Sequence, residues 1–219
     1  MLRTLEGGLA PQQEAEPHDK LECLRALERK VLWLSTWMIH NANHIRPNRD
    51  GLKVGGHQAS SASVVTLMTA LYFDVLRPQD RVAVKPHASP VFHAIQYLLG
   101  HQTRDKLERF RAFGGAQSYP SRTKDGETVD FSTGSVGLGV GMTLFASLAQ
   151  DYLRLKRLVP TDDSPGRMIA IDLVAQPLAE QHAIQRRGRD LSPLRGGSQL
   201  LLVDLGNEPQ HARVMRQPQ

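Results

Sequence analysis

Residues 81–100, with the sequence RVAVKPHASPVFHAIQYLLG, place a strand pattern directly before a helix pattern. Arg81–Val84 is a short β-branched run bounded by prolines, which is typical of a buried strand. Pro90 suits the first turn of a helix and Gly100 follows the last apolar position, so a helix is predicted over about 90–99. This stretch therefore predicts a strand whose carboxyl end leads into a helix.

The same alternation continues on both sides of this stretch. A second short apolar run, at residues 167–171, predicts another buried strand. Apolar residues recurring at steps of three or four predict helices over about 17–45, 60–76, 103–113 and 140–158. Helices that alternate with strands indicate an α/β fold with a mostly parallel sheet flanked by helices.

Composition divides the 219-residue chain into three parts. Residues 1–16 are polar and contain Pro and Gly, so we expect a flexible arm. Residues 17–171 carry the helix and strand patterns. Residues 172–219 contain no aromatic residue and no Lys, and only Leu200–Val203 has a strand pattern. We therefore expect a divergent, poorly packed tail with one strand at most.

Charge and cysteine content limit the class of protein. Lys and Arg number 27 against 22 Asp and Glu, a net charge of +5, and the densest basic cluster is Arg186, Arg187 and Arg189. No aromatic pair or zinc-finger spacing accompanies that cluster, which favours a solvated surface over a nucleic-acid surface. The single Cys23 excludes an internal disulfide. No apolar run reaches the ~20 residues of a membrane span, and no secretory leader is recognisable, so we expect a cytoplasmic protein without a membrane partner.

Three segments carry residues suited to ligand binding. Gly55–Ser61 precedes a predicted helix, where paired glycines permit close approach of a ligand and would display His57. Lys85–Pro90 follows the predicted strand, where open α/β sheets place ligands, and contains His87. The glycine-rich segment 132–141 lacks the spacing of a dinucleotide fingerprint or a P-loop. Each segment also fits a purely structural loop.

Four motifs, taken in order, resemble the cofactor-binding N-terminal domain of transketolase-like, thiamine-diphosphate-dependent enzymes. They are Gly55–Ser60, Pro86–Pro90, Gln117–Pro120 and Gly134–Gly139. The resemblance covers roughly residues 26–171 and is nearest to the homodimeric pyruvate dehydrogenase decarboxylating component, with transketolase more distant. It implies an incomplete thiamine-diphosphate-binding fold, with thiamine diphosphate and Mg²⁺ as cofactors. The implied substrate is a 2-oxo acid or a sugar phosphate, undergoing decarboxylation or two-carbon ketol transfer.

The resemblance also implies roles for individual residues. His57 would face the diphosphate and the substrate, with Ser60 beside the same diphosphate. His87 resembles the second active-site histidine, which acts as an acid/base or stabilises an intermediate. Tyr119 matches the tyrosine of the Ser-Tyr-Pro loop. The backbone that meets the aminopyrimidine ring corresponds to Gly137, Leu138 and Gly139.

The sequence departs from the family pattern after Ile171. The family continues with Gly-Asp-Gly, whose aspartate holds Mg²⁺, whereas this chain continues Asp172-Leu173-Val174-Ala175. Asp172 and Asn207 are the only candidate remnants of the magnesium ligands. Lys85 and Pro86 also replace the small polar lead-in to the second histidine. We therefore expect a chain that is truncated or frameshifted after Ile171 and lacks the domain that carries the activating glutamate, and such a chain should be inactive alone. A gene split or true divergence would produce the same departure from the family sequence.

Two functions from other classes remain open. The chain could be a non-catalytic interaction protein that pairs with a full-length paralogue through the same helices. For the partner we expect either a second copy of this chain or a related chain, as a homo- or heterodimer. It could also be a basic nucleic-acid binder that uses the arginine-rich tail.

Overall fold

The computed structural model describes residues 17–47, 51–125, 128–134, 137–159, 165–174, 199–204 and 213–214. For 17–18, 173–174, 199–204 and 213–214 the backbone alone is described. The expected arm at 1–16, the arginine cluster of the tail and Asn207 lie outside these residues.

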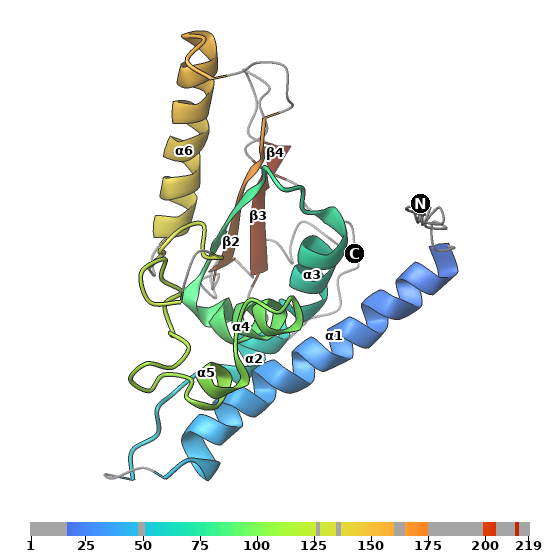
Figure 1. The fold of residues 1–219 in the computed structure, drawn as a ribbon, viewed down its shortest axis with the longest axis vertical. Helices are drawn as coiled ribbons and strands as arrows, with labels where there is room; N and C mark the ends of the chain where they lie inside the picture. The colour runs from blue at the N-terminus through green and yellow to red at the C-terminus, as the bar shows by residue number, and fades with distance from the viewer. Residues whose placement is uncertain are drawn as a thin grey trace, which may run out of the picture.

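The described chain alternates helices and strands, as the sequence predicts (Figure 1). The strands are β1 Arg81–Val84, β2 Met168–Val174, β3 Gln199–Asp204 and β4 Arg213–Val214. The α-helices are α1 Pro17–His40, α2 Gln58–Ala62, α3 Val65–Ala70, α4 Ser89–Leu98, α5 Arg104–Glu108 and α6 Leu138–Leu155. Two π-helical turns, η1 Asn41–Ile45 and η2 Leu71–Val75, and a 3-10 turn, η3 Pro86–Ala88, complete the elements.

The sheet has the strand order β1-β2-β3-β4. β1 and β2 are parallel, with Val82 opposite Ile169, whereas β2 pairs antiparallel with β3 and β3 antiparallel with β4. The α/β class is therefore present, but the expectation of a mostly parallel sheet is wrong for the described strands. An apolar run predicts a strand without its direction, because the direction depends on the connection that precedes the strand.

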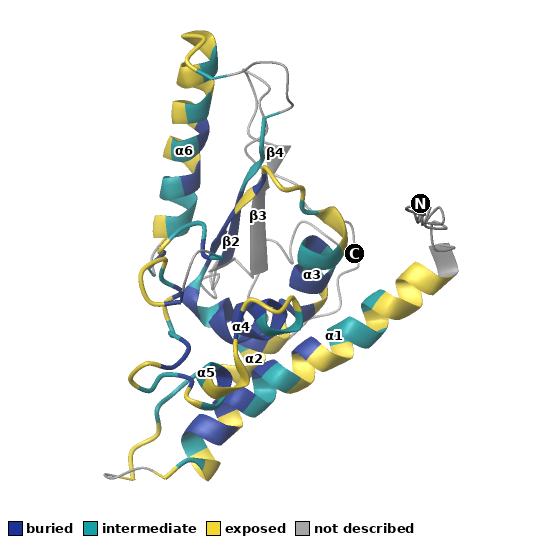
Figure 2. Cartoon of the chain, in the orientation of Figure 1, coloured by how far each residue is buried: buried dark blue, intermediate teal, exposed yellow. Residues whose placement is uncertain are grey.

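Successive residues of β1 face opposite sides of the sheet. Val82 and Val84 belong to the main core, which they share with β2 and with apolar residues of α3 and α4; these include Val65, Met68, Val91, Phe92, Ile95, Ile169 and Ile171. Figure 2 shows these buried positions gathered around the strands and the short helices. On the other side of β1, a Cβ added to Gly139 would lie 3.4 Å from Ala83 Cβ, so the start of α6 approaches β1 closely.

A buried carboxylate joins the starts of β1 and β2. The Asp80 side chain is fully buried and accepts hydrogen bonds from Arg77 N at 2.9 Å and from Arg167 N at 2.8 Å. The Arg167 guanidinium also donates to it, from Nε at 3.0 Å and Nη2 at 2.6 Å. Burial opposes ionisation of Asp80, but the hydrogen bonds from Arg167 and Arg77 outweigh it and hold its pKa well below the usual range. Asp80 thus fixes the register in which the two parallel strands begin.

Two predicted helices are shorter than expected. The helix predicted over 60–76 is divided into α2 and α3 by a turn at Ser63 and Val64. The Ser63 hydroxyl donates to the Ser60 carbonyl at 2.8 Å, and this local bond competes with continued helix formation. The helix predicted over 103–113 ends at Glu108, because Arg111 adopts a left-handed φ of 61° and its N–H donates to Ala116 O at 2.9 Å.

The described part of the tail contains more strand than the sequence predicts. β3 includes the predicted Leu200–Val203, but β4 is a second strand and β2 continues past Ile171 to Val174. No helix among the described residues is long and apolar enough to cross a membrane.

Candidate functional site

His57 and His87 lie face to face although they belong to different loops. Their ring centroids are 5.2 Å apart, with an angle of 27° between the ring planes. His57 is the residue before α2, and His87 lies in the η3 turn that follows β1. The structure therefore brings together the imidazoles of two separate loops.

The loop that carries His57 is held by Asn43 of η1. Asn43 Nδ2 donates to Gly55 O at 3.0 Å, and Gly55 N donates to Asn43 Oδ1 at 2.9 Å. Gly55 and Gly56 have φ values of 86° and 119°, which residues with a Cβ rarely adopt. A Cβ on Gly56 would also lie 3.1 Å from Ile39 Cγ2. The paired glycines let this loop lie close against α1, which sets the position of His57.

Arg111 reaches the same loop from the turn after α5. Its Nη1 donates to Val54 O at 3.0 Å, and its guanidinium carbon lies 5.4 Å from the centroid of the Phe110 ring. The turn itself is anchored to η1, because Arg46 Nη1 donates to Phe110 O at 2.8 Å. Hydrogen bonds therefore hold both the backbone turn that carries Arg111 and the guanidinium end of its side chain.

Tyr119 lies in a loop that a buried histidine positions. His93 is fully buried in α4, and its Nε2 donates to Gln117 O at 2.7 Å while Gln102 Nε2 donates to its Nδ1 at 3.3 Å. Asp125 Oδ1 accepts a hydrogen bond from Gln117 N at 3.0 Å. These contacts fix the backbone just before Tyr119, whose ring is half exposed.

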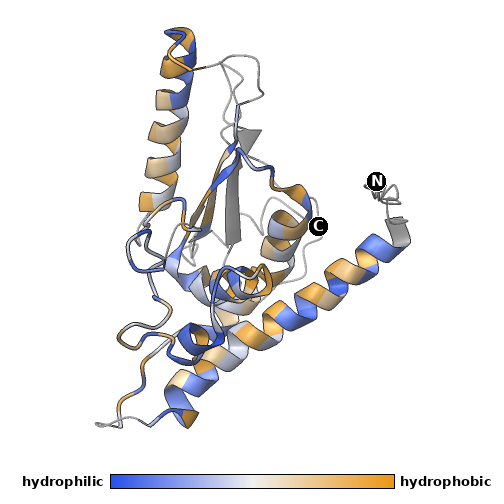
Figure 3. Ribbon diagram, viewed as in Figure 1, coloured by the Kyte–Doolittle hydropathy of each residue, from blue (hydrophilic) through white to orange (hydrophobic). Residues whose placement is uncertain are grey.

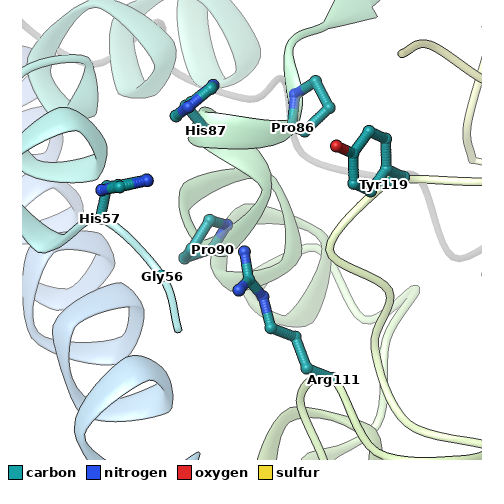
Figure 4. A pocket seen from close by; sticks show the side chains of 7 residues that line it. All are labelled: Gly56, His57, Pro86, His87, Pro90, Arg111 and Tyr119. Carbon is teal, nitrogen blue, oxygen red and sulfur yellow. The ribbon is translucent and has the colours of Figure 1, made fainter. Parts of the chain in front are cut away.

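These loops enclose a small pocket of about 140 Å³ (Figure 4). In the close-up, the Arg111 guanidinium and the Tyr119 hydroxyl point toward the space that the two imidazoles border. Its lining residues are Gly56, His57, Pro86, His87, Pro90, Arg111 and Tyr119. The pocket is smaller than the ~300 Å³ of an ordinary organic-ligand site. It has the dimensions of a site for a small polar molecule.

The electrostatic surroundings of His87 favour a neutral imidazole. Burial lowers the pKa of His87 from its ordinary 6.5, and the nearby His57 and Lys85 lower it further. Asp172 acts in the opposite direction, and Arg111 adds a smaller lowering effect. Its Nδ1 is buried without a hydrogen-bond partner among the described residues. His87 is thus available to accept a proton or a hydrogen bond from a ligand.

The expected magnesium ligand Asp172 has a different partner. It is buried in β2, and its carboxylate forms an ion pair with the Lys85 ammonium. No group of three His, Cys, Asp or Glu side chains that could hold a metal ion is found within the described ranges. Because the Lys85 ammonium already neutralises the Asp172 carboxylate, the described residues do not fit a Mg²⁺ site, which needs several oxygen ligands.

The other predicted site residues lie outside the pocket lining. Ser60 is in α2, where its carbonyl accepts the Ser63 hydroxyl. Gly137 precedes α6 with a left-handed φ of 78°, and Leu138 and Gly139 form the first turn of that helix. Their loop is joined to the end of β1, because Thr133 Oγ1 donates to Val84 O at 2.6 Å. The structure therefore brings together His57, His87 and Tyr119. Ser60 lies in α2, which follows His57, and a Cβ added to Gly139 would lie 3.4 Å from Ala83 Cβ of β1.

Sequence reasoning missed Arg111 and Asn43. Asn43 lies between His40 and His44 at a polar helix end, and an arginine after a helix is ordinarily a surface residue. The signal that could have located Arg111 is the pair Gly114-Gly115, which follows it and permits the tight turn. A Cβ on Gly115 would lie 1.8 Å from Arg109 O.

No protein-family model matches the chain, but several curated proteins do. The pyruvate dehydrogenase E1 component of Mycolicibacterium smegmatis is 31% identical over 144 residues, which is 61% of this chain and 15% of that protein. The E1 component of Haemophilus influenzae is 29% identical over 69% of this chain and 18% of its own length. That of Cupriavidus necator is 33% identical over 50% of this chain and 13% of its own length.

These comparisons show a relationship to pyruvate dehydrogenase E1 components. The likeness covers between 50% and 69% of this chain in the three proteins named. The chain spans less than a fifth of the length of each of these relatives.

Proposed function

We propose that this chain is a partial member of the thiamine-diphosphate-dependent 2-oxo acid dehydrogenase lineage that does not turn over substrate on its own. The observation that carries the proposal is the pocket in which His57, His87 and Tyr119 meet. The three residues come from three of the motifs on which the resemblance rests. The similarity to pyruvate dehydrogenase E1 components supports a 2-oxo acid, rather than a sugar phosphate, as the substrate class of the lineage.

The two imidazoles are suited to proton transfer at a small substrate. The surroundings of His87 lower its pKa, so its imidazole is uncharged near pH 7. An uncharged imidazole is an effective general base. His57 faces it across 5.2 Å, so both rings border the same bound molecule. In this proposal Tyr119 contributes its hydroxyl to the same space.

The fit of the cofactor is the reason for proposing inactivity. Asp172 is paired with Lys85, and the pocket of about 140 Å³ is too small for a complete thiamine diphosphate. We therefore assign to this chain the substrate-facing part of the ancestral site, without a magnesium-anchored diphosphate.

The direct test is calorimetry of the purified full-length chain with thiamine diphosphate and Mg²⁺, together with an assay of carbon dioxide release from pyruvate. We expect no turnover and no magnesium-dependent binding. A full-length E1 component from one of the named relatives serves as the positive control under the same conditions. Magnesium-dependent binding at micromolar concentration would contradict the proposal.

A second function, pairing with a full-length paralogue, is favoured by the apolar surface of α6. Phe145, Leu148, Tyr152 and Leu155 follow one another at steps of three or four residues and are 55–80% exposed. Figures 2 and 3 show exposed and hydrophobic positions together along this helix. Such a stripe on one helix is typical of a helix-packing surface.

Size-exclusion chromatography with a full-length E1 component tests the pairing. Complex formation that is lost in Phe145→Glu but retained in Arg104→Glu would support it, because Arg104 is exposed on the distant helix α5. Nucleic-acid binding remains a prediction, since the arginine cluster lies outside the described residues. A salt-dependent mobility shift with DNA is its test.

A further inference from the structure

Arg111 is an unusual residue for the wall of a small pocket. Its Nε is buried without a hydrogen-bond partner among the described residues, and its Nη1 donates to the uncharged Val54 carbonyl. Burial lowers its pKa, with only Tyr119 acting in the opposite direction. The Arg111 side chain is partly buried, and a guanidinium that is partly withdrawn from water without an anionic partner is stabilised when a ligand supplies one.

The backbone of Arg111 is also held in a conformation that an arginine rarely adopts. Its φ of 61° is left-handed, which is strained for a residue with a Cβ. Hydrogen bonds to Ala116 O from its own N–H and to Phe110 O from Arg46 maintain this turn. The strain has a geometric result, since it directs the side chain out of the turn and into the pocket.

The other cation at this edge of the sheet is already neutralised. Lys85 is paired with Asp172, so its charge is compensated within the described structure. The pocket therefore combines one uncompensated guanidinium with two imidazoles and the hydroxyl of Tyr119. Guanidinium groups bind carboxylate and phosphate oxygens through paired N–H donors.

We propose that Arg111, together with His57 and His87, binds a small oxyanion in this pocket without a divalent cation. The ligand is a carboxylate or a phosphate group that fits about 140 Å³. The site is the pocket of the proposed function, but it requires neither thiamine diphosphate nor Mg²⁺. Absence of oxyanion binding in EDTA would overturn this proposal and not the proposed function. Magnesium-dependent binding of thiamine diphosphate would overturn the proposed function and not this proposal.

Calorimetry of the full-length chain in EDTA tests this site with three probes: inorganic phosphate, pyrophosphate and pyruvate. We expect saturable binding of at least one probe, and its identity distinguishes a phosphate from a carboxylate ligand. Arg111→Gln should weaken that binding about 10- to 100-fold, since a hydrogen-bonded charge is lost. Arg104→Gln removes the same charge from an exposed position and should leave the affinity within twofold.

A second variant and an NMR measurement distinguish loss of anion binding from loss of folding. Arg111→Gly tolerates the left-handed backbone, so it replaces Arg111→Gln if that variant fails to fold. Histidine NMR provides a readout that a structural effect would not produce, because a bound anion should raise the pKa of His87 in the native chain and not in Arg111→Gln. Absence of binding for all three probes, equal affinity in the variant, or a requirement for Mg²⁺ would each overturn the proposal.

Discussion

Asn43 holds Gly55 by both ends of its side-chain amide, accepting from Gly55 N at 2.9 Å and donating to Gly55 O at 3.0 Å. The Asn43 amide thus makes the two hydrogen bonds to the Gly55 backbone that a neighbouring β-strand would make. Asn43 Nδ2 also donates to Ile39 O at 2.7 Å, which ties the loop to the end of α1. His57 is two residues beyond this clamp, so its position depends on Asn43.

Asn43→Ala should loosen the His57 loop. Losing hydrogen bonds at both ends of Gly55 should lower the free energy of unfolding by about 1–3 kcal/mol. Urea denaturation measures this loss, and NMR signals of His57 and His87 should broaden because their stacking is no longer fixed. Gln58→Ala is the control, since its amide makes a single exposed contact at 3.5 Å. If both variants have equal stability, the clamp does not support the loop.

Gly55→Ala and Gly100→Ala form a matched pair. Both glycines have left-handed φ values, 86° and 80°, so each alanine should cost about 1–2 kcal/mol in backbone strain. A Cβ at Gly55 would lie 2.9 Å from Arg111 Nη1, whereas nothing lies within 4 Å of one at Gly100. Gly55→Ala should therefore displace the Arg111 side chain and weaken oxyanion binding, which calorimetry measures. Equal oxyanion affinity in the two variants would show that Arg111 does not depend on this contact.

Local sequence patterns predicted the elements whose causes are local. Arg81–Val84 and the run up to Ile171 are strands in which β-branched residues at alternate positions face the main core and an alanine faces the opposite side. Pro90 lies in the first turn of α4, and Gly100 follows its end with φ 80°, as the proline and glycine positions indicated. The direction of β3 was not predictable, because it depends on the connection between β2 and β3 and not on the Leu-rich run itself.

Part of the candidate site could likewise be predicted from local residue patterns. His57 and His87 stand in glycine- and proline-marked loops, and such loops can be recognised from neighbouring residues. Arg111 reaches the pocket because its N–H bonds to Ala116 O within the turn and because the distant Arg46 donates to Phe110 O. The pairing of Asp172 with Lys85 likewise depends on the register of β1 against β2, which no single segment specifies.

The pKa of His87 should respond unequally to the two pocket residues that lower it, His57 and Arg111. Removal of either neighbour raises the pKa, because a nearby positive charge disfavours the imidazolium. His57→Gln should raise it more than Arg111→Gln does, since His57 contributes the larger lowering effect. Burial acts in both variants, so both values should stay below 6.5. Histidine NMR titration measures the order, and the opposite order would contradict the geometry of the pocket.

Asp80→Asn should destabilise the junction of β1 and β2, and the effect should depend on pH. Removing the charge that Arg77 and Arg167 surround should lower the free energy of unfolding by about 3 kcal/mol at pH 7. Because the folded pKa of Asp80 lies below its unfolded value, the unfolded chain binds more protons. The contribution of Asp80 is therefore complete above the unfolded pKa of about 3.9 and is lost as the pH falls toward the folded pKa. Urea denaturation at pH 7, 5, 4 and 3 should show the stability difference between native chain and variant shrinking below pH 4. The control is Asp74→Asn, which removes an exposed ion pair with Lys20. This variant should change the free energy of unfolding by less than about 1 kcal/mol at every pH. A difference between native chain and Asp80→Asn that stays constant from pH 7 to pH 3 would mean that the Asp80 carboxylate is not held ionised by its arginine partners.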